Sequence, residues 1–397
     1  MYYLKMRVVI VGGCGHVGLP FGVSLANLDC EVIAYDINKN SVDVVNSGST
    51  PFLEEGLELG LKSALMHGFR ATTNPAAISS AEIVIMIIGT PLDENLDPDL
   101  KIVFSAINDI SDYLNDDQLL ILRSTVFPGC TKQIELNLKQ IGKNPEISFC
   151  PERILEGKAM EELHTLPQII GANTDKAFNR SAELFAKFGV KIIRTTPEEA
   201  ELVKLFTNSW RYIKFAAANE FWMIANNLGI DFENVRSALT FDYPRAEDLP
   251  GAGFTAGPCL FKDTKQLSVA NLNKFAMGNA AIEINDGLPN YIVNRLSSRH
   301  NLSEITIGIL GMAFKSESDD TRSSLSYSIK DLLSKQCRKV LTHDPYVKND
   351  LDLVSLQVIL ENADILVIGA PHNIYKTVLT PKPIIDVWNL LKRGSSI

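Results

Sequence analysis

The sequence lacks the features that mark several large classes of protein. No apolar run approaches the roughly 20 residues that cross a bilayer; a typical one, 83–88, is far shorter. No block of lysine and arginine occurs, and 38 basic side chains face 47 acidic ones, for a formal net charge of −9. A chain of this charge repels a phosphate backbone. We therefore expect neither a membrane span nor a nucleic-acid partner.

Cysteine and histidine are few and unpatterned. The six cysteines, at positions 14, 30, 130, 150, 259 and 337, have no CxxC spacing, which argues against a zinc site and a disulfide scaffold. The six histidines form no cluster, although His343 and His372 border expected strand ends. We expect no metal. Residues 1–11 lack the apolar core and cleavage site of a secretory leader, so we expect a cytoplasmic protein.

The composition that remains is that of a folded globular protein. The 397 residues are 46% hydrophobic and 21% charged, and one core stops growing at roughly 250–300 residues. Two or three domains are therefore expected. The first half alternates helical patterns with short β-branched runs, which predicts a parallel α/β sheet. These strand candidates are 8–11, 32–35, 83–88, 119–122, 147–150 and 190–193.

A long helical pattern interrupts this alternation between Pro197 and about Gly229, with no internal glycine or proline. After Asn301 the alternation resumes, with strand candidates 305–310, 340–342, 365–368 and 384–387. The fold class predicted is α/β, with two Rossmann-like doubly wound domains joined by a long central helix. The expected domains are 1–195, 196–298 and 299–397.

The central helix carries more apolar surface than one packing seam can cover. Its aromatic residues are Trp210, Tyr212, Phe215, Phe221 and Trp222. We therefore expect it to form a homodimer contact.

A dinucleotide-binding pattern lies at the N-terminus. Gly13-Cys14-Gly15-His16-Val17-Gly18 follows a strand and opens a helix, and Asp36 closes the next strand, 18 positions after Gly18. Gly13 is expected to allow the tight turn, Gly15 the approach to the pyrophosphate, and Gly18 the packing of the helix. Asp36 would hold the ribose hydroxyls and repel a 2′-phosphate. This favours NAD, although Lys39 nearby keeps NADP open.

The stretch from Gly251 to Asp263 contains the candidate nucleophile. Cys259 ends a glycine-rich turn, with Lys262 three and Asp263 four residues beyond it. A thiol placed near a positive charge and a base can react. The same pattern also fits a small buried hydrophobic residue at a helix start.

Three other segments favour the reactive interpretation. Lys204, Asn208 and Arg211 share one face of the central helix, where a solvated stripe is the alternative. Glu152 and Glu156 follow one strand end, and 123–125 (Arg-Ser-Thr) follow another. Ligands of α/β sheets bind at such strand ends.

Taken together, these segments resemble the nucleotide-sugar 6-dehydrogenases, the family of UDP-glucose and UDP-N-acetylhexosamine dehydrogenases, over nearly the whole chain. The motifs that carry the resemblance are Gly18-Leu19-Pro20, Ser124-Thr125-Val126, Pro151-Glu152-Arg153, the helix from Glu201 to Asn208, Gly257-Pro258-Cys259 with Asp263, and Phe314-Lys315 through Asp320-Thr321-Arg322.

The resemblance implies a four-electron oxidation of C6 of a UDP-sugar, from alcohol to carboxylate, with two hydride transfers to NAD. Cys259 would capture the aldehyde as a thiohemiacetal, whose oxidation gives a thioester. Lys204 and Asn208 would donate to the charged intermediate. Asp263 and Glu152 would handle protons and the hydrolytic water, and Thr125 would help position that water.

The resemblance also implies binding residues. The expected cofactor set is Gly13, Gly15, His16, Val17, Gly18, Asp36, Thr90, Ser124, Thr125 and Arg322. The expected substrate set is Glu152, Arg153, Glu156, Lys204, Asn208, Arg211, Arg245, Gly257, Phe314 and Lys315. Within it, Lys315 would bind the UDP on the C-terminal domain, and Arg245 would reach the sugar nucleotide of a partner subunit. A role in polysaccharide biosynthesis would follow.

Departures from the family pattern bear on the substrate. His16 stands where the family usually has tyrosine, and Gly-Pro-Cys259 looks like the triplet of some UDP-N-acetylmannosamine dehydrogenases. Pro151-Glu-Arg and the segment from Asn208 to Arg211 lean the same way. We therefore expect a UDP-N-acetylhexosamine, such as UDP-N-acetylmannosamine, with UDP-glucose as the alternative.

Two other classes of function share part of the pattern. A two-electron NAD-dependent hydroxyacid dehydrogenase would form one NADH per substrate and need no thiol. A non-catalytic NAD-binding regulator would lack the set of Lys204, Cys259 and Asp263, which this sequence retains.

Overall fold

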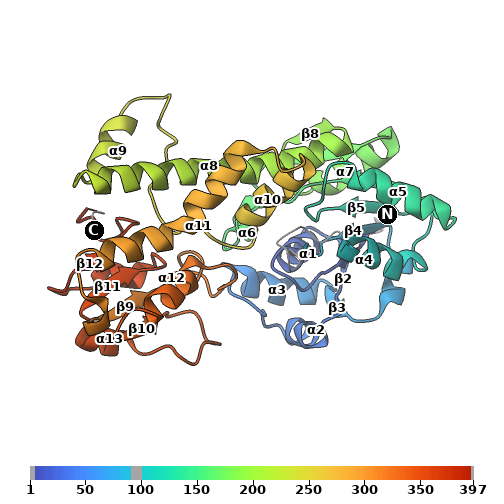
Figure 1. Cartoon of the computed structure of the whole chain (residues 1–397). Helices are drawn as coiled ribbons and strands as arrows, with labels where there is room; N and C mark the ends of the chain where they lie inside the picture. Colours follow the sequence, from blue (N-terminus) through green and yellow to red (C-terminus); the bar gives the residue numbers. More distant parts are fainter. Residues whose placement is uncertain (1–4, 91–100, 395–397) are drawn as a thin grey trace. The chain divides into compact units, whose positions relative to one another are not determined.

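The computed structural model describes residues 5–90 and 101–394. The chain divides into two compact units, Met1–Phe206 and Thr207–Ile397. Helix α8 (Pro197–Asn227) is the expected long helix (Figure 1), and the boundary between the two units falls within its residues. The finer division into 1–195, 196–298 and 299–397 stays a prediction, and its two outer ends lie outside the described residues.

The first unit contains a sheet whose described strands have the order β3-β2-β1-β4-β5-β6-β7-β8. Their bounds are β1 Arg7–Val11, β2 Glu31–Tyr35, β3 Arg70–Thr72, β4 Ile83–Met86, β5 Leu119–Leu122, β6 Glu146–Phe149, β7 Gln168–Ala172 and β8 Ile192–Thr195. All neighbours pair in parallel except β6 and β7. The expected parallel sheet is therefore confirmed for β1 to β6, whereas β7 and its parallel neighbour β8 run in the opposite direction. A parallel neighbour needs a crossover connection, usually a helix, and the only helix between these strands is the four-residue α6.

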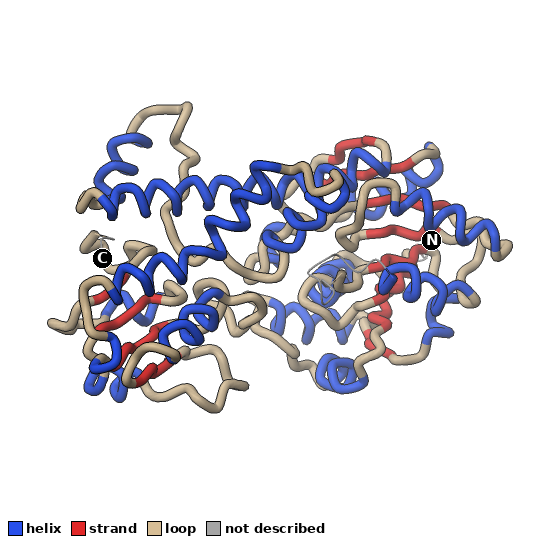
Figure 2. Tube along the Cα trace, in the orientation of Figure 1, coloured by secondary structure: helices blue, strands red, loops and turns tan. Residues whose placement is uncertain are grey.

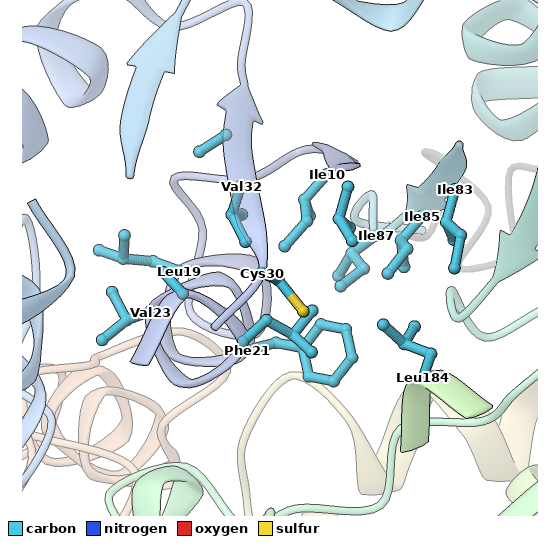
Figure 3. Close-up of a cluster of buried hydrophobic side chains, with 14 of the residues drawn as sticks. Ile10, Leu19, Phe21, Val23, Cys30, Val32, Ile83, Ile85, Ile87 and Leu184 are labelled. Atoms are coloured by element: carbon cyan, nitrogen blue, oxygen red, sulfur yellow. The ribbon is translucent and has the colours of Figure 1, made fainter. Parts of the chain in front are cut away.

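Helices cover both faces of this sheet, and the strand residues alternate between them. Val8 and Ile10 pack with residues of α1 and α7, whereas Val9 and Val11 pack with residues of α4 and α5. Figure 3 shows the first of these clusters, in which Phe21 and Leu184 face Ile10 and Ile85. The helix bounds are α1 Gly18–Asn27, α2 Lys39–Asn46, α3 Leu57–Met66, α4 Lys101–Ser111, α5 Cys130–Gln140, α6 Ala159–Glu162 and α7 Asp175–Ala186, with the 3-10 helix η1 at Pro75–Ser80.

The second unit contains a smaller, wholly parallel sheet with the order β10-β9-β11-β12. Figure 2 draws its strands in red, at the lower left of the view. Its strands are β9 Thr306–Leu310, β10 Lys339–His343, β11 Ile365–Ile368 and β12 Ile384–Ile385. The helices of this unit are α9 Phe232–Thr240, α10 Leu260–Ala270, α11 Ala276–Ser297, α12 Leu325–Ser334 and α13 Leu356–Asn362, with 3-10 helices η2 Leu302–Glu304 and η3 Asn373–Thr377. The predicted fold of two Rossmann-like sheets and a long central helix is confirmed.

Within residues 5–90 and 101–394, none of the helices combines the length and the apolar character that crossing a membrane requires. The same residues contain no cluster of three or more histidine, cysteine or carboxylate side chains that could hold a metal ion.

Candidate active site

The glycine turn after β1 has the geometry of a dinucleotide-binding loop, with one correction. The tight turn expected at Gly13 lies one residue earlier, where Gly12 has a positive φ of +78°. A Cβ at Gly12 would lie 2.0 Å from the carbonyl oxygen of Ile87. Gly13 has a different function, because its Cβ would lie 2.6 Å from Cα of Ala34 on β2. Gly13 therefore lets the loop pack closely against the next strand.

The other two glycines fit the expected roles. A Cβ at Gly18 would lie 2.3 Å from the carbonyl oxygen of Gly12, so only glycine lets α1 pack so closely on the strand end. A Cβ at Gly15 would meet no atom nearer than 3.6 Å, so the protein's own packing does not require glycine there. Helix α1 starts after Val17 with no side-chain cap and no acidic residue in its first turn. A helix N-terminus with no capping side chain and no acidic residue suits a pyrophosphate, so these residues fit NAD.

Asp36 lies directly after β2 and joins the two loops of the site. Its Oδ2 accepts a hydrogen bond from the Cys14 amide at 3.1 Å, and its Oδ1 accepts one from the Asn38 amide at 3.0 Å. The residue is half-buried. The ammonium of Lys39 pairs with Asp43 at 3.0 Å, so Lys39 already has a carboxylate partner.

His16 brings the cofactor loop beside an expected substrate residue. Its ring stacks on Phe52 with centroids 4.0 Å apart, and its Nδ1 lies 3.8 Å from Oε1 of Glu156. Glu54, two residues after Phe52, accepts hydrogen bonds from the amides of residues 157 and 159 at 2.7 and 2.8 Å. The segment 52–54 therefore links the glycine loop to the Glu156 loop. This link was not predicted, because nothing local in the sequence marks Glu54.

Glu152 is buried at the end of β6 and forms an ion pair with Arg123 at the end of β5. Its Oε1 accepts hydrogen bonds from the amides of Arg153 at 2.7 Å and Ile154 at 3.0 Å. Burial alone would raise the pKa of Glu152, but the charge and hydrogen bond of Arg123, the Ile154 amide and the charge of Lys204 outweigh it and lower the pKa. Glu152 is therefore held as a carboxylate, which can accept a proton but has none to donate.

Arg123 is fixed independently of Glu152. Its guanidinium lies 4.6 Å from the ring centroid of Phe21 and 5.1 Å from that of Phe185, and it donates to Oε1 of Gln168 at 3.1 Å. Aromatic faces on a guanidinium give the geometry of cation–π contacts. The neighbouring Arg153 donates to the carbonyl of Pro167, and burial lowers its pKa.

The loops that carry Ser124, Thr125 and Thr90 are anchored from both sides. Oγ of Ser124 accepts a hydrogen bond from the Ile88 amide at 2.8 Å, which joins the segments after β5 and β4. Glu201 of α8 is buried and accepts hydrogen bonds from the amides of residues 129 and 131 at 2.5 and 2.8 Å. Burial raises the pKa of Glu201. Thr125 is half-buried and Thr90 is buried.

Cys259 is the only exposed cysteine of the six, all of which the structure describes. It stands immediately before the first residue of α10, where the partial positive charge of a helix N-terminus favours a thiolate. The alternative of a buried hydrophobic residue is therefore wrong for Cys259, but it describes most of the others. Burial raises the pKa of Cys14, Cys130 and Cys150 to about 12 and also raises that of Cys30.

Two contacts shape the surroundings of Cys259 within the second unit. Gly257 has a φ of +103°, and its Cβ would lie 2.6 Å from the ring of Phe314. Asp263 is buried one turn into α10, and its Oδ2 accepts a hydrogen bond from Nδ2 of Asn208 at 2.6 Å. Lys262 pairs with its Oδ1 at 3.5 Å. Asn208 is therefore a buried partner of Asp263, and not part of a solvated stripe.

The remaining expected residues are distributed as follows. Lys204 and Arg211 are half-buried, and Lys204 belongs to the first unit whereas Cys259 belongs to the second. Arg322 pairs with Asp320 at 2.6 Å, and Nζ of Lys315 lies 5.3 Å from the ring centroid of Phe314. Nε of Arg245 donates to the hydroxyl of Tyr243 at 2.8 Å. The catalytic and binding roles of the residue sets stay predictions.

A dinucleotide-type loop on one sheet, a second parallel sheet and an exposed cysteine at a helix start together define a class: NAD-binding dehydrogenases with an additional nucleotide-binding domain. Three models of the UDP-glucose/GDP-mannose dehydrogenase family match the chain. They are its NAD binding domain at residues 6–189, its central domain at 198–287 and its UDP binding domain at 308–393.

Known proteins align over nearly the full length. The chain is 31% identical to the UDP-N-acetyl-D-mannosamine dehydrogenase of Pyrococcus horikoshii, over 98% of this chain and 96% of the relative. It is 30% identical to an NDP-N-acetyl-D-galactosaminuronic acid dehydrogenase of Ralstonia nicotianae, over 96% and 94%. A UDP-glucose dehydrogenase structure from Pyrobaculum islandicum superposes with a TM-score of 0.90 at 26% identity, over 96% of this chain and 94% of that one.

The chain belongs to the UDP-glucose/GDP-mannose dehydrogenase family. The expected family is confirmed, and so are NAD as cofactor and an oxidoreductase activity on nucleotide sugars.

Proposed function

We propose that this protein oxidises C6 of a UDP-N-acetylhexosamine from alcohol to carboxylate with two equivalents of NAD, converting UDP-N-acetylmannosamine to its uronate. The observation that carries the proposal is Cys259, exposed at the start of α10 in a chain whose other five cysteines are partly or fully buried. The substrate is supported by the Pyrococcus horikoshii relative, named for UDP-N-acetyl-D-mannosamine, and by the Gly-Pro-Cys259 triplet.

The reaction needs a covalent step because the aldehyde formed by the first oxidation is reactive. When bound, NAD accepts a hydride in each oxidation. The Cys259 thiolate adds to the aldehyde carbon and gives a thiohemiacetal, and loss of the second hydride leaves a thioester. Water then cleaves the C–S bond and releases the carboxylate and the thiol. In sum, one alcohol and one water give one carboxylate, two hydrides and three protons.

Asn208 and Asp263 act together in this proposal. Nδ2 of Asn208 carries two hydrogens, and the bond to Asp263 uses one of them. The second is available for the oxyanion of the thiohemiacetal, and Asp263 fixes its direction. The ammonium of Lys204 supplies a second donor to the same charge.

Glu152 and Thr125 serve the hydrolysis. Because Arg123 holds Glu152 as a carboxylate, Glu152 can take a proton from the attacking water. The hydroxyl of Thr125 helps to position that water.

The test of the reaction is a panel of UDP-sugars assayed for NADH formation: UDP-N-acetylmannosamine, UDP-N-acetylglucosamine, UDP-N-acetylgalactosamine and UDP-glucose. We expect turnover to require the acetamido group. Cys259→Ser should lower uronate formation by about a thousandfold or more, whereas the control Cys337→Ser, in the same unit, should keep the native rate. A Cys259→Ser enzyme that completes the oxidation at the native rate would refute the proposal.

UDP-glucose is the second candidate substrate. The solved UDP-glucose dehydrogenase from Pyrobaculum islandicum has the same fold over nearly the whole chain. Preference for UDP-glucose over all three acetamido sugars in the panel would select it and discard the first candidate.

We also propose that the protein acts as a homodimer through α8. Within the second unit, Trp210, Phe221 and Ile224 of α8 are 55%, 45% and 52% exposed, and their spacing places them on one helix face. Exposed apolar stripes of this kind mark interfaces. A stable monomer in sedimentation at micromolar concentration would end this part of the proposal. A cytoplasmic location and a place in polysaccharide biosynthesis complete it.

A further inference from the structure

The loop between β9 and α12 carries the residues expected to meet UDP. This nucleotide loop, residues 311–324, contains Phe314, Lys315 and Arg322. It closes on itself, because the amide of Phe314 donates to the carbonyl of Asp320 at 2.9 Å, and the Asp320 carboxylate binds the guanidinium of Arg322. What holds the whole loop in place lies outside it.

Asp344 fixes the first part of the nucleotide loop. It follows β10 and is buried, and its Oδ2 accepts hydrogen bonds from the amides of Met312 at 2.7 Å and Ala313 at 2.9 Å. Its Oδ1 accepts two more, from residues 346 and 347 of its own loop. Burial would raise the pKa of Asp344, but its bond to His372 and these amides lower it to about 2. Asp344 is therefore ionised, and it is saturated in the sense that both of its oxygens already accept hydrogen bonds from the protein.

His372 fixes the second part of the loop. Its ring is wholly buried, and Nδ1 lies 2.9 Å from the amide nitrogen of Glu317. A backbone N–H can only donate, so Nδ1 carries no hydrogen and Nε2–H donates to Oδ2 of Asp344 at 3.0 Å. The imidazole acts as a bridge between the loops that follow β9, β10 and β11.

Glu317 needs this support because its backbone is strained. Its φ is +54°, in the left-handed region that costs a residue with a Cβ free energy. Its carboxylate accepts hydrogen bonds from the amide of Asn373 and the hydroxyl of Tyr346, both at 2.7 Å. Together with the hydrogen bond from the Glu317 amide to His372, these contacts hold the loop at residue 317. Phe314 and Lys315 therefore lie between two fixed points, at 313 and 317.

We propose that His372 and Asp344 are positioning residues for UDP recognition, and that His372 holds the nucleotide loop in the conformation that presents Phe314 and Lys315 to the nucleotide. The inference rests on the proposed function only in taking UDP as the ligand of the second sheet, whose residues 308–393 match a UDP binding domain. Neither residue touches the nucleotide in this account. Each acts through the loop.

The surroundings of His372 define what protonation would do. Asp344 faces its Nε2 and Glu317 faces its Nδ1, while the rings of Tyr346 and Tyr375 pack on it at 5.0 and 5.7 Å; His343 is the other titratable group close enough to act on it. A hydrogen on Nδ1 would oppose the Glu317 amide. Oε1 of Glu317 lies 3.9 Å from Nδ1, beyond hydrogen-bond distance, so the loop would have to shift before it could accept that hydrogen.

Two amide substitutions separate the two bonds of the imidazole. Asn places an oxygen near Nδ1, so His372→Asn keeps an acceptor for the Glu317 amide. Gln places a nitrogen near Nε2, so His372→Gln keeps the donor to Asp344 but loses that acceptor. His343→Gln is the matched control, because the ring of His343 bonds to Tyr375 and not to the loop.

The experiment is calorimetric titration of the full-length enzyme with UDP alone, alongside KM values for the UDP-sugar and for NAD. We expect His372→Gln to weaken UDP binding and raise the UDP-sugar KM about tenfold, and His372→Asn to change them less than about threefold. The His343→Gln control should bind UDP as the wild type does. In the His372 variants, the NAD KM and kcat should stay near the wild-type values. Unchanged UDP affinity in His372→Gln, or an equal rise in both KM values, would overturn the proposal.

A second variant covers the case in which the histidine variants do not fold. Tyr346→Phe removes only the hydroxyl bond to Glu317, and the side chain is partly exposed. It should weaken UDP binding about two- to threefold, and no change would count against the proposal. Because UDP binding needs no turnover, an enzyme that binds UDP but oxidises no UDP-sugar would refute the proposed reaction and leave this inference standing.

Discussion

The two sheets share one arrangement, a glycine after the first strand and an aspartate after the neighbouring strand, but the two aspartates differ in what they bind. In the first, Gly12 follows β1 and Asp36 follows β2; in the second, Gly311 follows β9 and Asp344 follows β10. Both glycines have positive φ and donate to the last residue of the neighbouring strand, at 2.9 and 2.8 Å. Both aspartates accept amide hydrogen bonds from the loop that follows the glycine.

The difference lies in how far each carboxylate is saturated. Asp36 accepts from two amides and remains half-buried, whereas buried Asp344 accepts from four amides and His372. A half-buried carboxylate with spare lone pairs can still bind a ribose. A buried carboxylate such as Asp344, whose lone pairs already accept hydrogen bonds from the protein, cannot bind a ribose. The comparison teaches that one strand-end acid can serve a ligand directly or can serve the loop that meets the ligand.

The largest expected effect tests whether both glycine turns, at Gly12 and Gly311, exclude a side chain. Gly12→Ala and Gly311→Ala add a Cβ 2.0 and 2.5 Å from backbone atoms, at positive φ, so each should cost more than about 3 kcal/mol of unfolding free energy. Gly142→Ala is the control, because it has φ +79° but no atom within 4 Å, and it should cost about 1 kcal/mol. Denaturant unfolding measures all three, and equal losses would contradict the close packing of both turns.

The second effect concerns acid stability and belongs to the second sheet. The pKa of Asp344 is lowered from 3.8 to about 2, so its contribution is present above the unfolded value and is lost as pH falls from about 4 towards 2. Such a shift corresponds to about 2 kcal/mol. Asp344→Asn should remove that part of the pH dependence from thermal unfolding curves. An identical acid limb in wild type and variant would show that Asp344 is not held as described.

The smallest effect concerns cofactor choice and belongs to the first sheet. Asp36→Ser removes the charge that repels a 2′-phosphate and should lower the KM for NADP about tenfold. Because Lys39 is paired with Asp43, its charge is partly offset, and NAD should remain usable. Steady-state kinetics with both cofactors measure the ratio. If NADP stays as poor a substrate as in wild type, Asp36 does not set the preference.

Most strands could be predicted because short runs rich in apolar and β-branched residues mark them. β3 is only three residues long, and β7 reads Gln-Ile-Ile-Gly-Ala after Pro167, so neither has a strand signal that stands out from a loop. The antiparallel pairing of β7 depends on how the chain returns after β6. That is a property of the connection, and not of either strand.

The candidate site was predictable residue by residue but not contact by contact. The local sequence around Cys259 and around Asp36 is enough to mark each as a candidate site residue. The bond between Asn208 and Asp263 joins helices 55 positions apart, and the pairing of Arg123 with Glu152 depends on β5 and β6 being neighbours. His372 could be recognised only as a histidine at an expected strand end, because the loops it joins are brought together only by the order β10-β9-β11.

One measurement tests the central claim, the covalent four-electron oxidation, most directly. With NAD in excess and the UDP-sugar limiting, the account predicts about two NADH formed for each UDP-sugar consumed, with the uronate as product. About one NADH per sugar, with the aldehyde or another two-electron product released, would contradict it and would favour a two-electron dehydrogenase that needs no thiol.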